Sequence, residues 1–356
     1  MGSGRRNRRA LAPAGDVTAR RRSLLKAAAA GALAAALPAP VLVRRGSAAE
    51  PITVMTGFGL LPNFIEIMNA ASGGHFAHQG LDARVIGATG TAREMQQIVA
   101  GEAQFGRVAA LDQINAVARQ AVPLVAVATI CQGSAFQLVS PKQAPIRSAE
   151  DLKGKTVGIV SVGGSTDIFL DLILAKAGLP PDAVERQVTG DNPGALELAR
   201  RGRVDCFLCS LNVVVALERS GAAIAYWSTD RYAPMPGQVY QTTRRIIEER
   251  PDLVGRFLRA MKASVDELLT QPLAPIFARA ARDYDIPGLH DMATVVAVQQ
   301  ATAERLWLAQ GRANLLRNVP DLWASGVAAL RSAGRPVPAD PAVLYTNRFV
   351  DAALKG

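Results

Sequence analysis

The sequence predicts an α/β fold, because strand-type and helix-type patterns alternate through the first two-thirds of the chain. The stretch Thr156–Leu179 shows the repeating unit. An apolar run at residues 157–160 is typical of a buried strand, and the two glycines at 163–164 allow a tight turn. A helical pattern follows, which we expect Ser165 or Thr166 to cap. Such a helix N-terminus either seats an anion or is an ordinary turn, and the residues alone weigh the two equally.

The same patterns predict the other elements in order. Strands are expected at residues 52–56, 81–86, 103–108, 124–130, 136–139, 184–188, 204–208, 222–227 and 238–242. Helices are expected at residues 64–68, 91–100, 111–119 and 193–199, and another helix is expected to open at residues 210–212, before the strand at 222–227. After Pro251 the chain becomes helical, with an apolar stripe to Leu269 and breaks at Pro272, Pro287, Pro320 and Pro336. Residues 50–356 are numerous enough for two lobes of ordinary domain size.

The formal charge of +10 is concentrated at the N-terminus. Residues 1–49 hold ten of the 40 basic residues and one of the 30 acidic residues, which leaves 30 and 29 in the remainder. The rest of the chain is therefore nearly neutral, and we expect no nucleic-acid partner.

Residues 1–49 have the three parts of an export signal. Arg21 and Arg22 open the run RRSLLK, which resembles the twin-arginine motif; residues 27–37 form a short, weakly apolar core, and residues 47–49 a small-residue cleavage site. A membrane anchor is the alternative, which the brevity of the core and its following prolines disfavour. We expect a soluble protein, exported by the twin-arginine translocase to the periplasm or the cell exterior.

Two groups of residues suggest metal or redox chemistry but are better explained otherwise. Cys206 and Cys209 have CxxC spacing, yet no second cysteine pair completes a zinc site, so buried apolar positions on a strand are the better account. His75 and His78 lie in a glycine-rich stretch without a nearby carboxylate, which predicts a solvated loop. We expect no metal, no cofactor and no catalytic residue.

Several motifs, in their order and spacing, give the chain a family resemblance. They are AGEAQFG at 100–106, SAEDLKGKTVGI at 148–159, GGSTDIFLDLILAKAGL at 163–179, ARRGRVD at 199–205 and PGQVYQTTRRIIEERPDLVGRFLRAM at 236–261. Over about residues 50–270 the chain resembles the periplasmic solute-binding proteins of ABC importers for nitrate, sulfonates, taurine and the thiamine pyrimidine precursor.

The resemblance implies a type II periplasmic binding protein fold, in which two α/β lobes joined by two crossover strands close on a ligand. It implies a first lobe at residues 50–135, a second at 136–235, and a return to the first lobe with C-terminal helices at 236–356. The crossovers fall near Cys131–Ser140 and Thr229–Thr242. The implied partners are a small-molecule ligand and an ABC importer permease, and the implied state is a monomer.

The resemblance also places ligand-facing groups on particular loops. These are Gly57, Phe58, Leu60, Arg107, Gln132, Ser134, Gly164, Ser165, Thr166, Asn192, Ser210, Asn212 and Tyr232. Relatives usually carry a small or neutral residue at 107, so Arg107 either binds an anionic ligand group or is a surface arginine, solvated or paired to Asp112. Residues 213–215 are more apolar than in relatives, which leaves the contacts from the second lobe open.

Three functions follow from the resemblance. The first is a receptor that delivers a small organic anion or heteroaromatic compound to an ABC importer. The second is an enzyme, because some fungal relatives are pyrimidine synthases that use a cysteine-rich segment and pyridoxal phosphate; Cys206 and Cys209 match that segment poorly. The third is a receptor or sensor for a non-ABC membrane partner.

Overall fold

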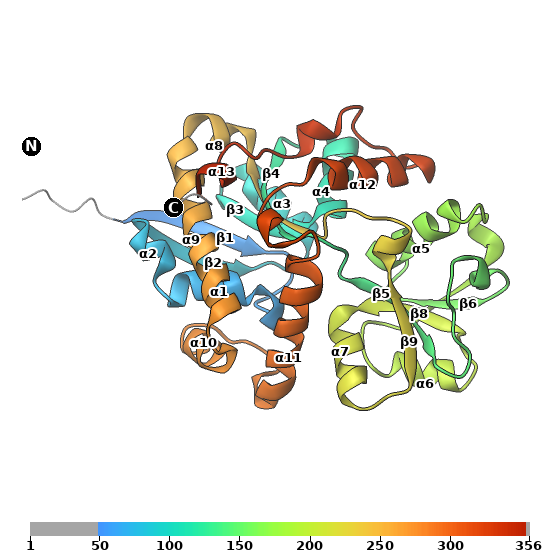
Figure 1. Cartoon of the computed structure of the whole chain (residues 1–356). Coiled ribbons are helices and arrows are strands. Elements are labelled where there is room, and N and C mark those ends of the chain that lie inside the picture. The colour runs from blue at the N-terminus through green and yellow to red at the C-terminus, as the bar shows by residue number, and fades with distance from the viewer. Residues whose placement is uncertain (1–48, 354–356) are drawn as a thin grey trace, which may run out of the picture. The chain divides into compact units, whose positions relative to one another are not determined.

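The computed structural model describes residues 49–353, and their strands form two separate five-stranded sheets (Figure 1). The first sheet has the order β2-β1-β3-β10-β4, in which β10 runs antiparallel to both of its neighbours and the β1 pairings are parallel. Its strands are β1 (Glu50–Thr56), β2 (Leu81–Gly87), β3 (Phe105–Ala109), β4 (Leu124–Cys131) and β10 (Gln238–Thr243).

The second sheet repeats this arrangement with the order β7-β6-β8-β5-β9. Strand β6 is parallel to β7 and β8, whereas β5 is antiparallel to β8 and β9. Its strands are β5 (Phe136–Pro141), β6 (Thr156–Ile159), β7 (Glu185–Val188), β8 (Cys206–Ser210) and β9 (Ile224–Ser228). We call this sheet and its helices the second lobe, and the first sheet and its helices the first lobe.

Helices follow strands through most of both lobes, as the alternating patterns predict. The first-lobe helices are α1 (Ile65–Ser72), α2 (His75–His78), α3 (Thr91–Ala100), α4 (Ala110–Gln120), α8 (Arg244–Glu249), α9 (Pro251–Thr270) and α10 (Leu273–Ala280). The second-lobe helices are α5 (Ser165–Lys176), α6 (Ala195–Arg200) and α7 (Leu211–Arg219). The C-terminal helices are α11 (Met292–Thr302), α12 (Pro320–Ser332) and α13 (Val350–Ala353).

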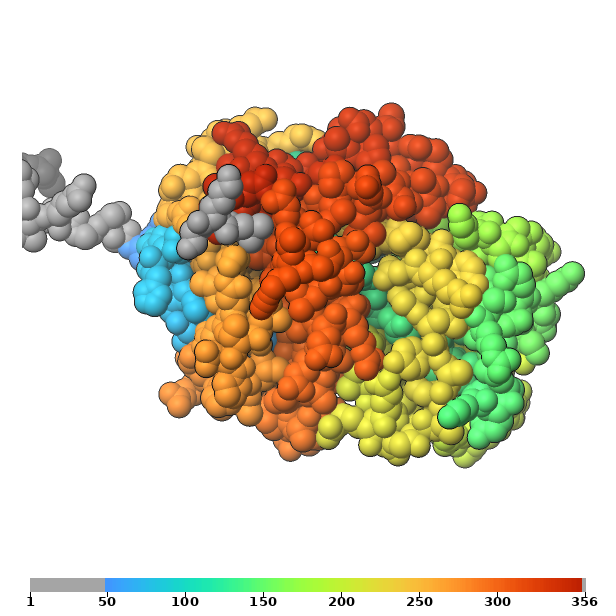
Figure 2. Space-filling view, in the orientation of Figure 1, coloured from blue at the N-terminus to red at the C-terminus, as the bar shows by residue number. Residues whose placement is uncertain are grey.

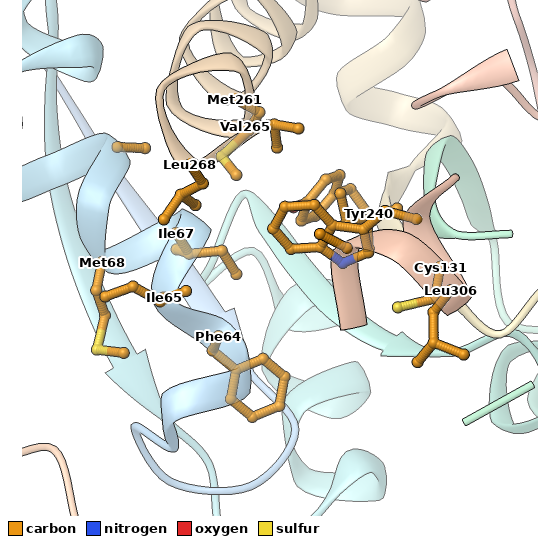
Figure 3. Packing of buried hydrophobic residues seen from close by; sticks show 14 of the residues in the cluster. Phe64, Ile65, Ile67, Met68, Cys131, Tyr240, Met261, Val265, Leu268 and Leu306 are labelled. Atoms are coloured by element: carbon orange, nitrogen blue, oxygen red, sulfur yellow. The ribbon is translucent and has the colours of Figure 1, made fainter. Parts of the chain in front are cut away.

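The period-two alternation of β1 explains how the first sheet is covered on both faces. Val54 belongs to the apolar cluster that contains α1 and α9, whereas its neighbour Met55 belongs to the cluster that contains Ile98 of α3. In the former cluster, the Phe257 ring of α9 stacks on Phe105 with centroids 3.9 Å apart. Figure 3 shows other side chains of α9 gathered over α1. The stripe that the sequence shows after Pro251 is therefore a core face.

The chain crosses between the sheets twice, after β4 and before β10. The Gly237 N–H donates to the Cys131 carbonyl at 2.8 Å, and the Ser134 N–H donates to Asp230 Oδ2 at 2.8 Å. The approach is so close that a Cβ on Gly237 would lie 2.0 Å from the Gly133 carbonyl oxygen. The two crossings therefore form one packed, hydrogen-bonded hinge.

The C-terminal helices contact the second lobe as well as the first. Helix α11 packs against α7 and α12 packs against α5, and Figure 2 shows this orange and red segment touching the yellow and green residues of the second lobe. Arg305 pairs with Glu218 at 3.2 Å, and Arg335 pairs with Asp171 of α5 at 2.8 Å. The C-terminal region therefore bridges the lobes, whereas the sequence predicted only a return to the first.

Three local predictions are wrong. Residues 75–78 are a short helix, not a solvated loop, because Phe76 is buried and His75 bonds Glu267 of α9 at 2.7 Å. Neither Ser165 nor Thr166 caps α5; the N-cap position is Gly164, without a side-chain cap. Helix α6 begins only at Ala195, after the turn that contains Asn192. Of the export-signal prediction at residues 1–49, all but Ala49 lies outside the described residues. Within residues 49–353, no helix has the length and apolarity needed to cross a membrane.

Candidate functional site

A cavity of about 540 Å³ lies between the two sheets, beside the hinge. Strand ends and helix starts of both lobes line it, as expected where open α/β sheets bind ligands. The first lobe contributes Gly57, Phe58, Phe64, Thr91, Arg107, Val108, Ala109, Leu111, Asp112 and Asn115. The second lobe contributes Phe136, Val160, Ser161, Gly163, Gly164, Ser165, Thr166, Ile168, Phe169 and Asp191. The hinge contributes Ser134, Ala135, Met235, Pro236, Gly237 and Gln238.

The N-terminus of α5 forms the second-lobe wall. The backbone N–H groups of Ser165 and Thr166 have no acceptor within the described part of the chain, as is usual for the first turn of a helix. The loop before them is held in place, because the Val160 N–H donates to Thr166 Oγ1 and the Gly163 N–H donates to Asp167 Oδ2. These free donors, at the positive end of a 12-residue helix, suit an anion or a carbonyl oxygen.

Arg107 lies in the first-lobe wall and forms a buried ion pair. Its Nη1 donates to Glu66 Oε1 at 2.7 Å and to the Asn63 carbonyl at 2.5 Å, and only 1% of the arginine is exposed. Burial raises the pKa of Glu66, and the guanidinium and the Tyr240 hydroxyl oppose that shift. Arg107 is therefore neither solvated nor paired to Asp112, and both of those predictions are wrong. Its Nε has no hydrogen-bond partner among the described residues.

Carboxylates also lie in or behind this wall. Asp112 and Asn115 are one helical turn apart on α4, and both line the cavity. Burial raises the pKa of Asp112, and the Thr91 hydroxyl opposes that shift. Glu94 is buried behind Gly57 and Gly106, and burial raises the pKa of Glu94 well above its ordinary value. Of these two carboxyl groups, Asp112 lines the cavity, whereas Glu94 lies behind the wall.

The structure brings seven of the predicted ligand-facing residues into the cavity lining. They are Gly57, Phe58, Arg107, Ser134, Gly164, Ser165 and Thr166. It places the other six outside the lining: Leu60, Gln132, Asn192, Ser210, Asn212 and Tyr232.

Three of the residues outside the lining make contacts elsewhere. Gln132 Nε2 donates to the carbonyls of Thr129, Asn314 and Arg317, which ties β4 to the C-terminal region. The Tyr232 hydroxyl accepts from the Ala149 N–H, and its ring packs on Trp227. The Asn192 side chain bonds the Gly194 N–H within its own loop, and Asn212 is exposed on α7.

Sequence reasoning missed Asp112, Asn115, Asp191 and Gln238, all of which line the cavity. Asp112 and Asn115 carried a usable signal, because they are polar residues three apart in the helix that follows β3. Asp191 is adjacent to the predicted Asn192 and accepts from the Ser210 N–H at 2.8 Å. Gln238 carried no signal, since its position depends on the hinge.

The cysteines are free and buried. Burial raises the pKa of both Cys206 and Cys209, which lie on β8 and outside the cavity lining. The interpretation of this pair as buried apolar positions is confirmed. Among residues 49–353, no group of three or more His, Cys, Asp or Glu is placed to hold a metal ion.

Asp230 gives the hinge a pH-dependent stability. Burial raises the pKa of Asp230 to about 6, against an ordinary value of 3.8. The folded protein therefore retains this proton where the unfolded chain has lost it, so the contribution to stability is present below about pH 4 and is lost as pH rises through 6. A shift of two pKa units corresponds to about 3 kcal/mol.

Asp230→Asn is accordingly expected to gain stability relative to wild type between pH 4 and pH 7. Asparagine can still accept the Ser134 N–H, but it cannot ionise. Unfolding midpoints of residues 50–356, wild type and variant, at both pH values check this. A difference between the two proteins that does not change with pH would contradict it.

Comparisons with known proteins agree with this architecture. The family model described as "NMT1/THI5 like" matches residues 61–274. The 4-amino-5-hydroxymethyl-2-methylpyrimidine phosphate synthase of Schizosaccharomyces pombe is 24% identical over 235 residues; the match covers 62% of this chain and 66%, just under two thirds, of that enzyme's length.

Two solved structures show the fold. The periplasmic sulfonate-binding protein SsuA from Methylobacillus flagellatus KT is similar with a TM-score of 0.65 at 20% identity, over 86% of this chain and 94% of its own. The periplasmic nitrate-binding protein NrtA from Synechocystis PCC 6803 is similar with a TM-score of 0.56 at 10% identity, over 86% of this chain and 89% of its own. This chain therefore has a periplasmic binding protein fold, which by itself does not establish what it binds.

Proposed function

The chain belongs to the NMT1/THI5-like family, and we propose on that basis that it is an extracytoplasmic receptor for a small solute. It captures a small organic anion or heteroaromatic compound between its lobes and delivers it to an ABC importer. It acts as a monomer, with a first lobe at residues 50–135, a second at 136–235 and a return at 236–356. Residues 1–49 direct its export to the periplasm or the cell exterior by the twin-arginine route.

One observation carries this proposal: a single cavity is lined by both lobes and by the hinge between them. A ligand there contacts the α5 amides on one side and the Arg107 wall on the other. Contacts to both lobes exist only when the lobes are close, so the ligand binds the closed state more tightly and shifts the population toward it. A transporter partner can then distinguish loaded from empty receptor by shape.

The S. pombe relative keeps an enzyme as the second candidate. The two candidates differ in what happens to the bound compound. A receptor releases its ligand unchanged, whereas a synthase alters it. Mass spectrometry of a compound recovered after incubation with the protein separates them.

A thermal-shift screen of residues 50–356 against sulfonates, carboxylates, nitrate and pyrimidines tests the proposed function. A compound that binds only the folded state raises the midpoint by an amount that grows with its concentration over Kd. We expect one class to do so. If none raised the midpoint, the receptor proposal would lose its main support.

Ser165→Pro is expected to weaken binding about tenfold or more while the helix stays intact. Proline is tolerated at the first helical position, and the preceding Gly164 has the extended backbone that proline requires. The change removes one amide donor aimed at the ligand, and losing a hydrogen bond to a charged group costs about 1.5–3 kcal/mol. Titration calorimetry with the compound found in the screen measures it.

Ser165→Ala is the matched control, because it removes the hydroxyl but keeps the N–H. Alanine should bind nearly as wild type does. Equal losses in both variants would show that the hydroxyl, and not the backbone amide, contacts the ligand.

A further inference from the structure

The charges around the cavity do not suit a simple anion. Arg107 is the one basic side chain in the lining formed by the described residues, and Glu66 already neutralises it at 2.7 Å. Two carboxylates, Asp112 and Asp191, also line the cavity, and no described salt bridge involves either. The net charge of the lining therefore favours a ligand that brings a positive charge of its own.

Hydrogen-bond acceptors gather on the first-lobe and hinge side of the cavity. Besides the Asp112 carboxylate, Asn115 Oδ1 and Gln238 Oε1 are buried there without a donor among the described residues. Leaving a buried acceptor unpaired costs free energy, which a donor on a ligand would recover. This side of the cavity therefore favours a ligand whose N–H or O–H groups face it.

The opposite side has the reverse character, because the Ser165 and Thr166 amides at the start of α5 are donors without acceptors. One more donor without a partner among the described residues, the Nε of Arg107, lies in the first-lobe wall. The α4 side of the cavity thus presents acceptors and the start of α5 presents donors, while the Asp191 carboxylate adds an acceptor to the second-lobe part of the lining. Phe58, Phe136 and Phe169 add apolar surface to the lining.

We propose that Asp112 and Asn115 determine specificity by binding a protonated amine, or a similar cationic N–H group, on a ligand whose opposite end is an acceptor. This inference rests on the proposed receptor function and narrows it: plain sulfonates, plain carboxylates and nitrate are poor cargo, and their amino-bearing counterparts are better. The raised pKa of Asp112 agrees with it, because a carboxylate desolvated without a cation gains most when one arrives.

Matched ligand pairs that differ by one amino group test the inference. Titration calorimetry compares 2-aminoethanesulfonate with ethanesulfonate, and 3-aminopropanoate with propanoate, against wild-type residues 50–356 at pH 7. We expect the amino member of at least one pair to bind about tenfold or more tightly, as for a hydrogen bond to a charged group. We expect Asp112→Asn to reduce that ratio to about threefold or less.

Two further variants keep the result interpretable. Asp191→Asn makes the same charge change in the same cavity, but on a side chain that already accepts from the Ser210 N–H, so it should lower the ratio less than Asp112→Asn does. Asn115→Leu removes an acceptor without changing the charge, and it should also lower the ratio. Circular dichroism and unfolding midpoints confirm that each variant is folded.

Each outcome is decisive. A ratio lost in Asp112→Asn and lowered less in Asp191→Asn supports the inference. Plain acids that bind as tightly as the amines, or equal losses in both aspartate variants, overturn it and leave the receptor function standing. If no member of any pair binds to wild type while the wider screen finds another ligand without an N–H donor, the inference alone fails; if nothing binds at all, the proposed function fails with it.

Discussion

Arg107→Ala is expected to lower the free energy of unfolding by about 3–5 kcal/mol, because it leaves the Glu66 carboxylate buried without its counter-ion. The loss extends beyond the pair. The Asn63 carbonyl and the Phe64 ring, which lies 4.8 Å from the guanidinium carbon, also lose a partner. Urea denaturation of residues 50–356 measures the change.

The matched control is a double replacement, Arg107→Met with Glu66→Leu. When both charges are replaced by apolar groups of similar size, no buried charge is stranded, so the double variant should be more stable than either single variant. Additive losses would show that the two side chains act independently. A cost below about 1 kcal/mol for Arg107→Ala would contradict the ion pair itself.

Gly237→Ala is expected to cost about 3 kcal/mol and to disturb the hinge. The new Cβ would lie 2.0 Å from the Gly133 carbonyl oxygen, and backbone cannot move aside as a flexible side chain can. Relief requires the two crossing segments to separate, which strains the Gly237-to-Cys131 hydrogen bond. Urea denaturation gives the stability, and calorimetry gives the effect on ligand affinity.

Gly255→Ala provides the control for this prediction. Gly255 lies inside α9, where the nearest atom to a new Cβ is the flexible Arg259 guanidinium at 3.4 Å. Alanine there should be neutral or stabilise the protein by up to about 1 kcal/mol, through helix propensity. A Gly237→Ala protein as stable as wild type would show that the hinge segments are not held at the described separation.

The elements of this fold could be predicted from the sequence because their signals are local. The apolar run Leu124–Ile130 predicted the buried strand β4, and the Thr91–Ala100 pattern predicted α3 at its observed bounds. The spacing of apolar residues and the capping of helices depend on residues within about one turn of each other, so both can be read from the local sequence. Apart from the short helix α2, the predicted order of strands and helices is confirmed through β10.

The partners of the site residues could not be predicted in the same way, because they depend on tertiary contacts. Arg107 of β3 pairs with Glu66 of α1, 41 positions earlier, and nothing in either local sequence marks that contact. Tyr232 lies in a predicted loop, but its ring turns into the second lobe to pack on Trp227. His75 was expected in a solvated loop because no carboxylate is near it in the sequence; its partner, Glu267, lies 192 positions later in the chain. A position in a predicted loop shows that a residue is able to reach a site, but only the tertiary structure shows whether the residue lies there.

The most direct measurement of the central account is the distance between the lobes with and without ligand. Spin labels on Leu61→Cys and Val162→Cys report it, because both positions are exposed, lie beside the cavity in opposite lobes and are absent from its lining. The three native cysteines are buried and should not compete for the label. If a compound that raises the unfolding midpoint is captured between the lobes, the mean distance shortens and its distribution narrows. An unchanged distribution at saturating ligand would contradict capture by closure.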